Sequence, residues 1–174
     1  MLRLSNALID VPIMSLRTTG MVATANQLII NPNNLKIEGW YCTDHFSKSA
    51  LILLAKDVRE IVPQGIAIDD YDVLTSPDEL IRLKDVIKLN FVVIGKPVTT
   101  DQKRRVGKVS DFAVDTNSFY IKKLYISEPL YRNFSGGQLS IDRTQIVEIT
   151  DKKITVRDVD QKAGVAMPAM GQAT

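Results

Sequence analysis

Two stretches of ten residues, 4–13 (LSNALIDVPI) and 89–98 (LNFVVIGKPV), decide how this chain is organised. Written one above the other, they match in their apolar positions and in the proline, at an offset of 85 residues. After a one-residue adjustment in the following turn, the match continues from residues 22–42 to residues 106–126. The period is too long for the common solenoid repeats, so the sequence predicts a duplicated unit of roughly 75 residues.

Each copy has the pattern of short β-strands. In the second copy, apolar residues alternate with other residues on both sides of residues 115–118 (DTNS), and the first copy does the same around residues 31–34 (NPNN). Alternation on both sides of a turn-forming tetrapeptide is typical of a β-hairpin. Short strands separated by regular turns favour a small barrel or sandwich. We therefore expect an all-β fold of two tandem small barrels, related by an approximate two-fold axis and with their strand edges closed.

The linker between the copies begins with the order of a helix start. In residues 76–79 (SPDE), serine can cap the helix, proline suits its first position, and Glu79 stands where a capping box places its acid. We predict a short linking helix over about residues 77–83, with Leu80, Ile81 and Leu83 touching the barrels. The expected boundaries are a first barrel at 1–75, a linker at 76–84, a second barrel at 85–160 and a mobile tail at 161–174.

The composition excludes several classes of protein. Hydrophobic residues make up 45% of the chain and charged residues 24%, as in a soluble globular protein. The longest apolar run, residues 50–55, is far short of the roughly 20 residues that cross a bilayer. The first residues lack the continuous apolar core of a secretory signal, so we expect a cytoplasmic protein without a transmembrane segment.

The second copy resembles the PRC-barrel family, which includes the H subunit of the photosynthetic reaction centre and the small-subunit ribosome maturation factor. The resemblance is carried by residues 94–98 (IGKPV), 106–111 (VGKVSD) and 146–149 (IVEI), together with Asp115. These are similar to the family's opening strand, glycine-marked turn and closing strand. The resemblance implies a barrel used for docking onto protein or ribosomal partners, with no shared catalytic constellation.

The first copy departs from the family's pattern at three positions. It has Asp10 where Gly95 lies, Ala23 where Gly107 lies and Gln27 where Asp111 lies.

Residues with chemical potential do not form a recognisable catalytic or metal site. The only cysteine, Cys42, aligns with the apolar Ile126, which indicates a buried strand position. On an extended strand it would point to the face opposite His45, the only histidine. The acidic run Asp69, Asp70 and Asp72, followed by Asp78 and Glu79, lacks the calcium-loop pattern and fits a solvated edge. We expect no enzyme activity, no cofactor and no catalytic or metal-binding residues.

Basic residues are the stronger signal. Residues 85–174 carry 14 Lys and Arg against 10 Asp and Glu, whereas residues 1–84 carry 8 against 10. If their loops share one end of the second barrel, they would form an electrostatic footprint for an anionic partner. The candidate contacts are Lys103, Arg104, Arg105, Lys108, Lys122, Lys123, Lys152 and Lys153.

Two functions follow from these features. The first is a non-enzymatic binding or scaffolding module that acts through protein–protein interaction, with self-association as one version of it. The alternative is an RNA- or ribosome-associated factor that uses the basic end of the second barrel. The net charge of +2 is low for a dedicated RNA-binding protein, which favours the first function. A small ligand between the barrels would leave no residue signature.

Overall fold

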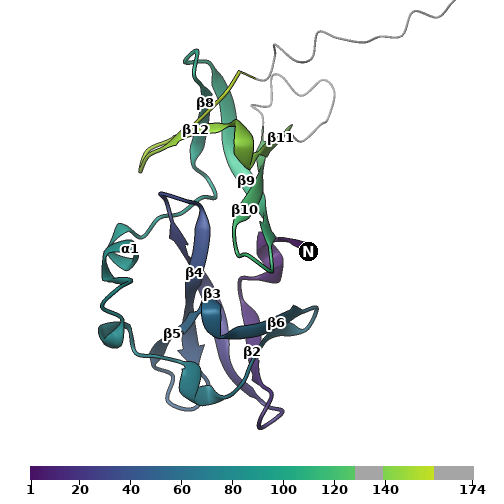
Figure 1. Cartoon of the computed structure of the whole chain (residues 1–174), viewed down its shortest axis with the longest axis vertical. Coiled ribbons are helices and arrows are strands. Elements are labelled where there is room, and N and C mark those ends of the chain that lie inside the picture. The colour runs from purple at the N-terminus through teal and green to yellow at the C-terminus, as the bar shows by residue number, and fades with distance from the viewer. Residues whose placement is uncertain (128–138, 159–174) are drawn as a thin grey trace, which may run out of the picture.

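The computed structural model describes residues 1–127 and 139–158, so the predicted tail at 161–174 lies outside the described residues. These residues form two β-sheets and one short α-helix, which confirms the predicted all-β fold (Figure 1). Within the described residues, no helix has the length and apolar character needed to span a membrane.

The first sheet has the strand order β5-β4-β3-β2-β7-β6. All neighbouring strands are antiparallel except β2 and β7, which are parallel. A single-turn 3-10 helix at Ala55–Asp57 separates β5 from β6. The strands are β2 (Val11–Ser15), β3 (Met21–Asn31), β4 (Lys36–Asp44), β5 (Ala50–Leu54), β6 (Val58–Val62) and β7 (Gly65–Ile68).

The second sheet repeats this topology. Its order is β11-β10-β9-β8-β13-β12, the β8–β13 pair is again the parallel one, and a 3-10 helix at Arg143–Gln145 again separates the two end strands. Each strand of the first sheet therefore has a counterpart six strands later, and the internal duplication is confirmed. The strands are β8 (Pro97–Thr100), β9 (Arg105–Asp115), β10 (Ile121–Ser127), β11 (Leu139–Asp142), β12 (Ile146–Ile149) and β13 (Ile154–Val156).

The strand registers agree with the sequence alignment. Leu28 lies opposite Trp40 in the first sheet, and their counterparts Phe112 and Leu124 lie opposite each other in the second. Both sheets are open paths of strands: within the described residues, the end strands of each path do not pair with each other. Each unit is thus a partly open barrel, and the expected closure of the strand edges is not found.

The backbone conformation is conserved between the units even where the residue type differs. Asp10 has a φ of 55°, in the left-handed region that its counterpart Gly95 also adopts with a φ of 84°. Aspartate enters this region more readily than most residues, because its short polar side chain can bond locally. The departure of the first copy from the glycine pattern at this position therefore leaves its turn intact.

The two units exchange backbone hydrogen bonds between equivalent residues. The N–H of Ile37 donates to the carbonyl of Phe119 at 2.8 Å, and the N–H of Ile121 donates to the carbonyl of Leu35 at 2.9 Å. Because Leu35 corresponds to Phe119 and Ile37 to Ile121, these reciprocal bonds lie about a local two-fold axis, as expected.

The segments before each unit also cross to the other unit. Strand β1 (Leu2–Leu4) pairs with β9, and the Ser5 hydroxyl donates to Asp111 at 2.6 Å. In the equivalent contact, the side-chain amide of Gln27 donates to the Asn90 side chain at 3.2 Å. The start of the chain is therefore part of the second sheet, a pairing that the sequence repeat did not predict.

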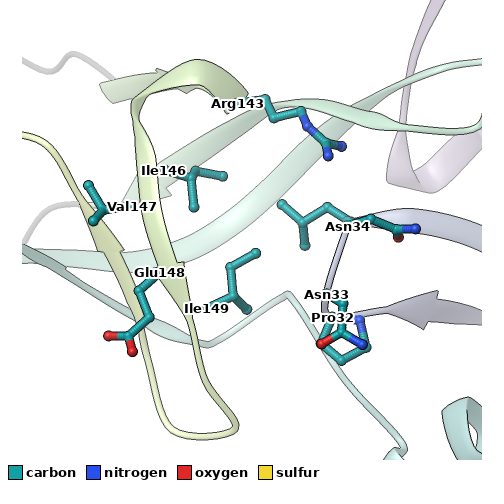
Figure 2. A pocket seen from close by; sticks show the side chains of 9 residues that line it. Pro32, Asn33, Asn34, Arg143, Ile146, Val147, Glu148 and Ile149 are labelled. Atoms are coloured by element: carbon teal, nitrogen blue, oxygen red, sulfur yellow. The ribbon is translucent and has the colours of Figure 1, made fainter.

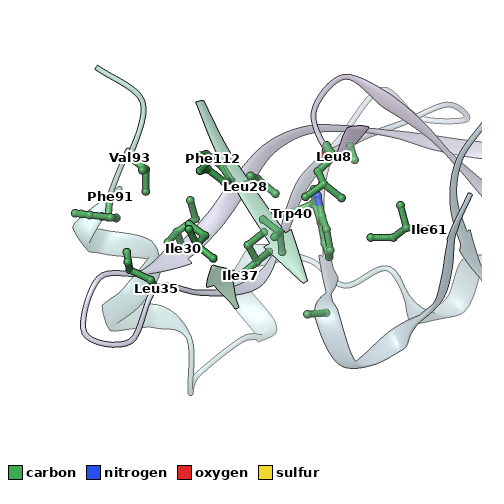
Figure 3. Packing of buried hydrophobic residues seen from close by; sticks show 14 of the residues in the cluster. Leu8, Leu28, Ile30, Leu35, Ile37, Trp40, Ile61, Phe91, Val93 and Phe112 are labelled. Carbon is green, nitrogen blue, oxygen red and sulfur yellow. The ribbon is translucent and has the colours of Figure 1, made fainter. Parts of the chain in front are cut away.

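Both units contribute to one hydrophobic core. Trp40 is fully buried, and its indole N–H donates to the carbonyl of Leu8 at 2.9 Å (Figure 3). The Trp40 ring meets Phe119 of the other unit edge to face, with centroids 5.7 Å apart. Such pairs add to the stabilisation from buried area, so this contact couples the stability of the two units.

The linking helix lies later in the chain than predicted. A single 3-10 turn covers Pro77–Glu79, and the α-helix α1 covers Lys84–Leu89. Thr75 is held in a bridge to Ile52, and the Ser76 side chain makes no capping hydrogen bond, so an α-helix does not start there. The predicted contact of Ile81 with the barrels is wrong, because this side chain is 84% exposed.

Candidate functional site

Four large apolar side chains are exposed at one end of the first sheet, and we call this surface the apolar end. They belong to the β2–β3 turn, the first residue of β3, the β4–β5 turn and the segment after β7. The exposed fractions are 57% for Leu16, 60% for Met21, 71% for Phe46 and 36% for Tyr71.

Asp44 holds two of these loops together. Asp44 is only 1% exposed, and its carboxylate accepts hydrogen bonds from the backbone N–H groups of Phe46 at 3.0 Å and Ser47 at 3.1 Å. It also accepts from the Ser47 hydroxyl and, at 3.0 Å, from the Tyr71 hydroxyl. Phe46 and Tyr71 meet edge to face with centroids 5.4 Å apart. The loop of Phe46 and the ring of Tyr71 are therefore held by contacts within the first unit.

The third loop is tied to the same end by Asp70. The Ser15 hydroxyl donates to Asp70 at 3.3 Å, and Arg17 forms an ion pair with it at 2.8 Å. Asp69 next to it accepts two hydrogen bonds from Arg59, and this pairing lowers the pKa of the Asp69 carboxyl. The acidic run that the sequence singled out is thus partly matched by arginines at the rim of the apolar end.

The pKa of Asp44 gives a testable pH dependence. The hydrogen bond from the Ser47 hydroxyl, with further bonds from Phe46, Ser47 and Tyr71, lowers the pKa of Asp44 to about 2. A carboxyl with a lowered folded-state pKa stabilises the fold above its unfolded pKa, roughly 3.9. We expect the urea midpoint of the wild type to fall as the pH falls from about 4 to about 2.

The variant Asp44→Asn isolates this contribution, because it removes the titrating carboxyl. We expect a lower midpoint at pH 6 and a shallower fall between pH 4 and 2 than in the wild type. Asp115, with a pKa lowered to about 2 mainly by the Ser118 hydroxyl, accounts for part of the fall that persists. Parallel midpoint curves for the two proteins would contradict the role given to Asp44.

The cysteine and the histidine lie in structural positions. Cys42 is 2% exposed, and burial raises the pKa of its thiol to about 12, so the nucleophilic thiolate does not form near neutral pH. His45 shares a 2.8 Å hydrogen bond with the hydroxyl of Thr24. No group of three His, Cys, Asp or Glu residues able to hold a metal ion occurs in the part of the chain that the structure describes.

The predicted basic residues do not share one end of the second unit. Lys103 and Arg104 lie in the β8–β9 turn with Arg105 directly after it at the start of β9, and Arg104 forms an ion pair with Asp158. Lys108 follows on β9, opposite Ser127, whereas Lys123 lies opposite Ala113. Along β9, Lys108 and the residue opposite Lys123 are five positions apart, which is about 17 Å in an extended strand.

The closing hairpin is also at a different end from the β8–β9 turn. Lys152 and Lys153 lie between β12 and β13, and β13 runs parallel to β8 with Ile154 beside Val98. They therefore adjoin the beginning of β8, while the turn carrying Lys103 and Arg104 follows its end. The structure keeps residues 103–105 together at one end of β8 and places Lys108 opposite Pro97 at its other end, the end that Lys152 and Lys153 adjoin.

A different cationic group surrounds Tyr120, and we call it the tyrosine cluster. Around the ring centroid lie the Arg143 guanidinium carbon at 4.8 Å, the Lys36 ammonium at 5.8 Å and the Lys122 ammonium at 5.9 Å. The sequence analysis did not predict this group, because Lys36 comes from the first unit and the others come from two segments of the second. The only hint was the repeat itself, which places Lys36 and Tyr120 at equivalent positions in the two hairpins.

A pocket of about 310 Å³ adjoins the tyrosine cluster (Figure 2). One wall is the first unit's hairpin turn, residues 32–35, and the other is Arg143 with strand β12. Ile146 and Ile149 face this turn across the pocket, whereas Glu148 points away from it (Figure 2).

A second and more apolar groove, of about 220 Å³, also lies between the units. It is lined by equivalent pairs, Ile9 with Ile94 and Leu28 with Phe112, together with residues 91–93 and two further side chains of β3. The groove therefore lies beside the local two-fold axis.

No family model matches the chain, and no curated protein is significantly similar to it. The resemblance to the PRC-barrel family therefore stays a prediction.

Proposed function

We propose that this protein is a non-enzymatic binding and scaffolding module of the PRC-barrel type, which acts through protein–protein contacts made by the apolar end. The repeated topology and register support a tandem of two related barrels. One observation carries this proposal: the Phe46 side chain is 71% exposed, although its loop is held by a hydrogen bond to Asp44 and its ring contacts Tyr71.

The chemistry of the apolar end favours a protein over a charged polymer. Interface hot spots are enriched in aromatic residues and benefit when side chains are already ordered before binding. The neighbouring charges are largely paired within the first unit, as Arg17 with Asp70 and Arg59 with Asp69. The surface therefore offers apolar contact area surrounded by charges that are paired with one another, which fits an apolar patch on a partner protein.

We expect a photo-reactive phenylalanine analogue at position 46 to crosslink one protein partner in extracts of the source cells. The partner would be identified by mass spectrometry, and a second copy of this chain would count as a partner. The same analogue at Lys152, exposed in the second unit, is the matched control and should not give that product. Crosslinking of the same proteins from both positions, or of none from position 46, would overturn the proposal.

With the crosslinked partner purified, Phe46→Ala should weaken binding by at least tenfold, as expected for a hot-spot aromatic residue. The melting temperature should stay close to that of the wild type, since the side chain is mostly exposed. Unchanged affinity in this variant would place the contact elsewhere.

The second candidate function is RNA or ribosome association through the second unit. It is supported by the three consecutive exposed cations Lys103, Arg104 and Arg105. The crosslinking experiment separates the two functions: a partner retained through RNA would be lost at high salt and after neutralising residues 103–105 and Lys108 together. A protein partner of the apolar end would survive both changes.

A further inference from the structure

We propose that the pocket between the first hairpin turn and strand β12 binds the phosphate group of a small phosphomonoester, with Arg143 as the principal contact. The site is separate from the apolar end and does not depend on the proposed protein-binding function. It combines three features: a guanidinium with one unpaired nitrogen, three cations gathered around one ring, and an apolar wall next to polar donors.

Arg143 lacks the partner that an enclosed guanidinium normally has. Its side chain is half-buried and stacks on Tyr120, and its Nη1 is enclosed without a hydrogen-bond partner among the described residues. Buried polar groups are rarely left unpaired, and an unpaired one suggests a missing ligand or solvent partner. Arg143 also lines the pocket, so an oxygen atom bound there would accept from the N–H groups of the guanidinium that are not enclosed.

Three cationic side chains lie together beside the pocket. Arg143, Lys36 and Lys122 converge on one ring, and such cations attract phosphate strongly. Two carboxylates adjoin these cations. Asp142 accepts from the N–H and hydroxyl of Thr144, and these bonds together with Lys123 and Lys122 lower the pKa of its carboxyl; Glu38 accepts from Asn31 at 3.4 Å. Glu148, which also lines the pocket, points away from the Arg143 side (Figure 2).

The opposite wall adds polar donors. The side-chain oxygen of Asn34 accepts the N–H of Lys36 at 2.9 Å, which directs the amide NH₂ group of Asn34 to donate to other acceptors. A tetrahedral phosphate can accept from a guanidinium and an amide at the same time, and it carries more negative charge than a carboxylate.

The size and the apolar wall of the pocket indicate that the phosphate carries a small organic group. A volume of about 310 Å³ lies at the lower end of the range for small-molecule sites. Ile146 and Ile149 supply apolar contacts that an inorganic ion cannot use. A phosphomonoester with a small apolar body uses both parts of the pocket.

The test is a titration of the full chain, labelled with nitrogen-15, with phenyl phosphate, inorganic phosphate and acetate in separate experiments. We expect phenyl phosphate to bind most tightly and acetate at least tenfold more weakly. The amide signals that shift should centre on residues 33–35 and 143–149. Shifts centred on residues 103–105, or no saturable shift with phenyl phosphate, would overturn the proposal.

The variant Arg143→Gln should weaken phenyl phosphate binding by roughly 10- to 100-fold, because it removes a charge-assisted hydrogen-bond donor. Arg105→Gln, which removes an exposed cation from the same sheet, is the matched control and should bind as the wild type does. Equal weakening in both variants would show a general charge effect and overturn the specific site. If Arg143→Gln does not fold, the positions of the shifting signals in the wild type decide the question alone.

Discussion

Replacing Trp40 with alanine is expected to lower the free energy of unfolding of the whole chain by about 3–5 kcal/mol. Trp40 is fully buried, donates to the Leu8 carbonyl and contacts Phe119 from the other unit. The substitution leaves a large cavity and an unpaired carbonyl at the place where the two units share their core. The loss should therefore affect both units together.

Urea unfolding followed by circular dichroism measures this effect, since the chain has one tryptophan and the variant has no indole fluorescence. Phe46→Ala is the matched control: it also removes a large aromatic ring, but one that is 71% exposed, so a change within about 0.5 kcal/mol is expected. A loss below about 1 kcal/mol in Trp40→Ala would contradict the shared core. So would two transitions of which only one moves.

The duplication was predictable because it depends on local patterns. Strand residues that alternate between core and solvent keep the same register in both units. Leu28 aligns with Phe112 and Trp40 with Leu124, and accordingly Leu28 pairs with Trp40 in the first sheet as Phe112 pairs with Leu124 in the second. Only a small adjustment in the turn between the first two strands of each unit was needed. Apolar periodicity and turn residues suffice for this level of structure.

The crossing of segments between the units was not predictable from the same patterns. The alignment of Leu4 with Leu89 suggested that each stretch begins its own unit, yet β1 joins the second sheet and Leu89 ends an α-helix. A strand of three residues has almost no periodicity of its own. Its pairing is decided by the exposed edge of β9, which is more than a hundred residues away in the chain.

The candidate sites show the same limit. Cations that are adjacent in the chain, such as Lys103 and Arg104, are visible in the sequence, but the structure separates the groups from one another, as Lys108 and Lys123 show. The tyrosine cluster was missed because Lys122 and Arg143 come from separate segments of the second unit, and Lys36 joins them only through the contact between the units.

The variant Gly107→Ala is expected to destabilise the protein by about 3 kcal/mol, in the upper part of the range for overpacked sites. A Cβ atom at this position would lie 2.1 Å from the carbonyl oxygen of Ser127 and 2.9 Å from Ile126. The contact is with backbone in the neighbouring strand β10, so a side-chain rotation cannot relieve it. The first unit has alanine at the equivalent position, Ala23, which lies opposite Asp44. Identical topology therefore does not make the two units interchangeable at this residue.

Two other glycines separate the steric effect from the general effect of adding a methyl group. Gly20→Ala would place its Cβ no closer than 3.8 Å to any neighbour, so we expect almost no change in the urea midpoint. Gly95→Ala has open space but a φ of 84°, and only the backbone strain, about 1 kcal/mol, should be measured. If Gly107→Ala were as stable as Gly95→Ala, the close approach of β9 and β10 would not control stability there. The predicted order, with Gly107→Ala least stable and Gly20→Ala most stable, follows from contact distance and φ together.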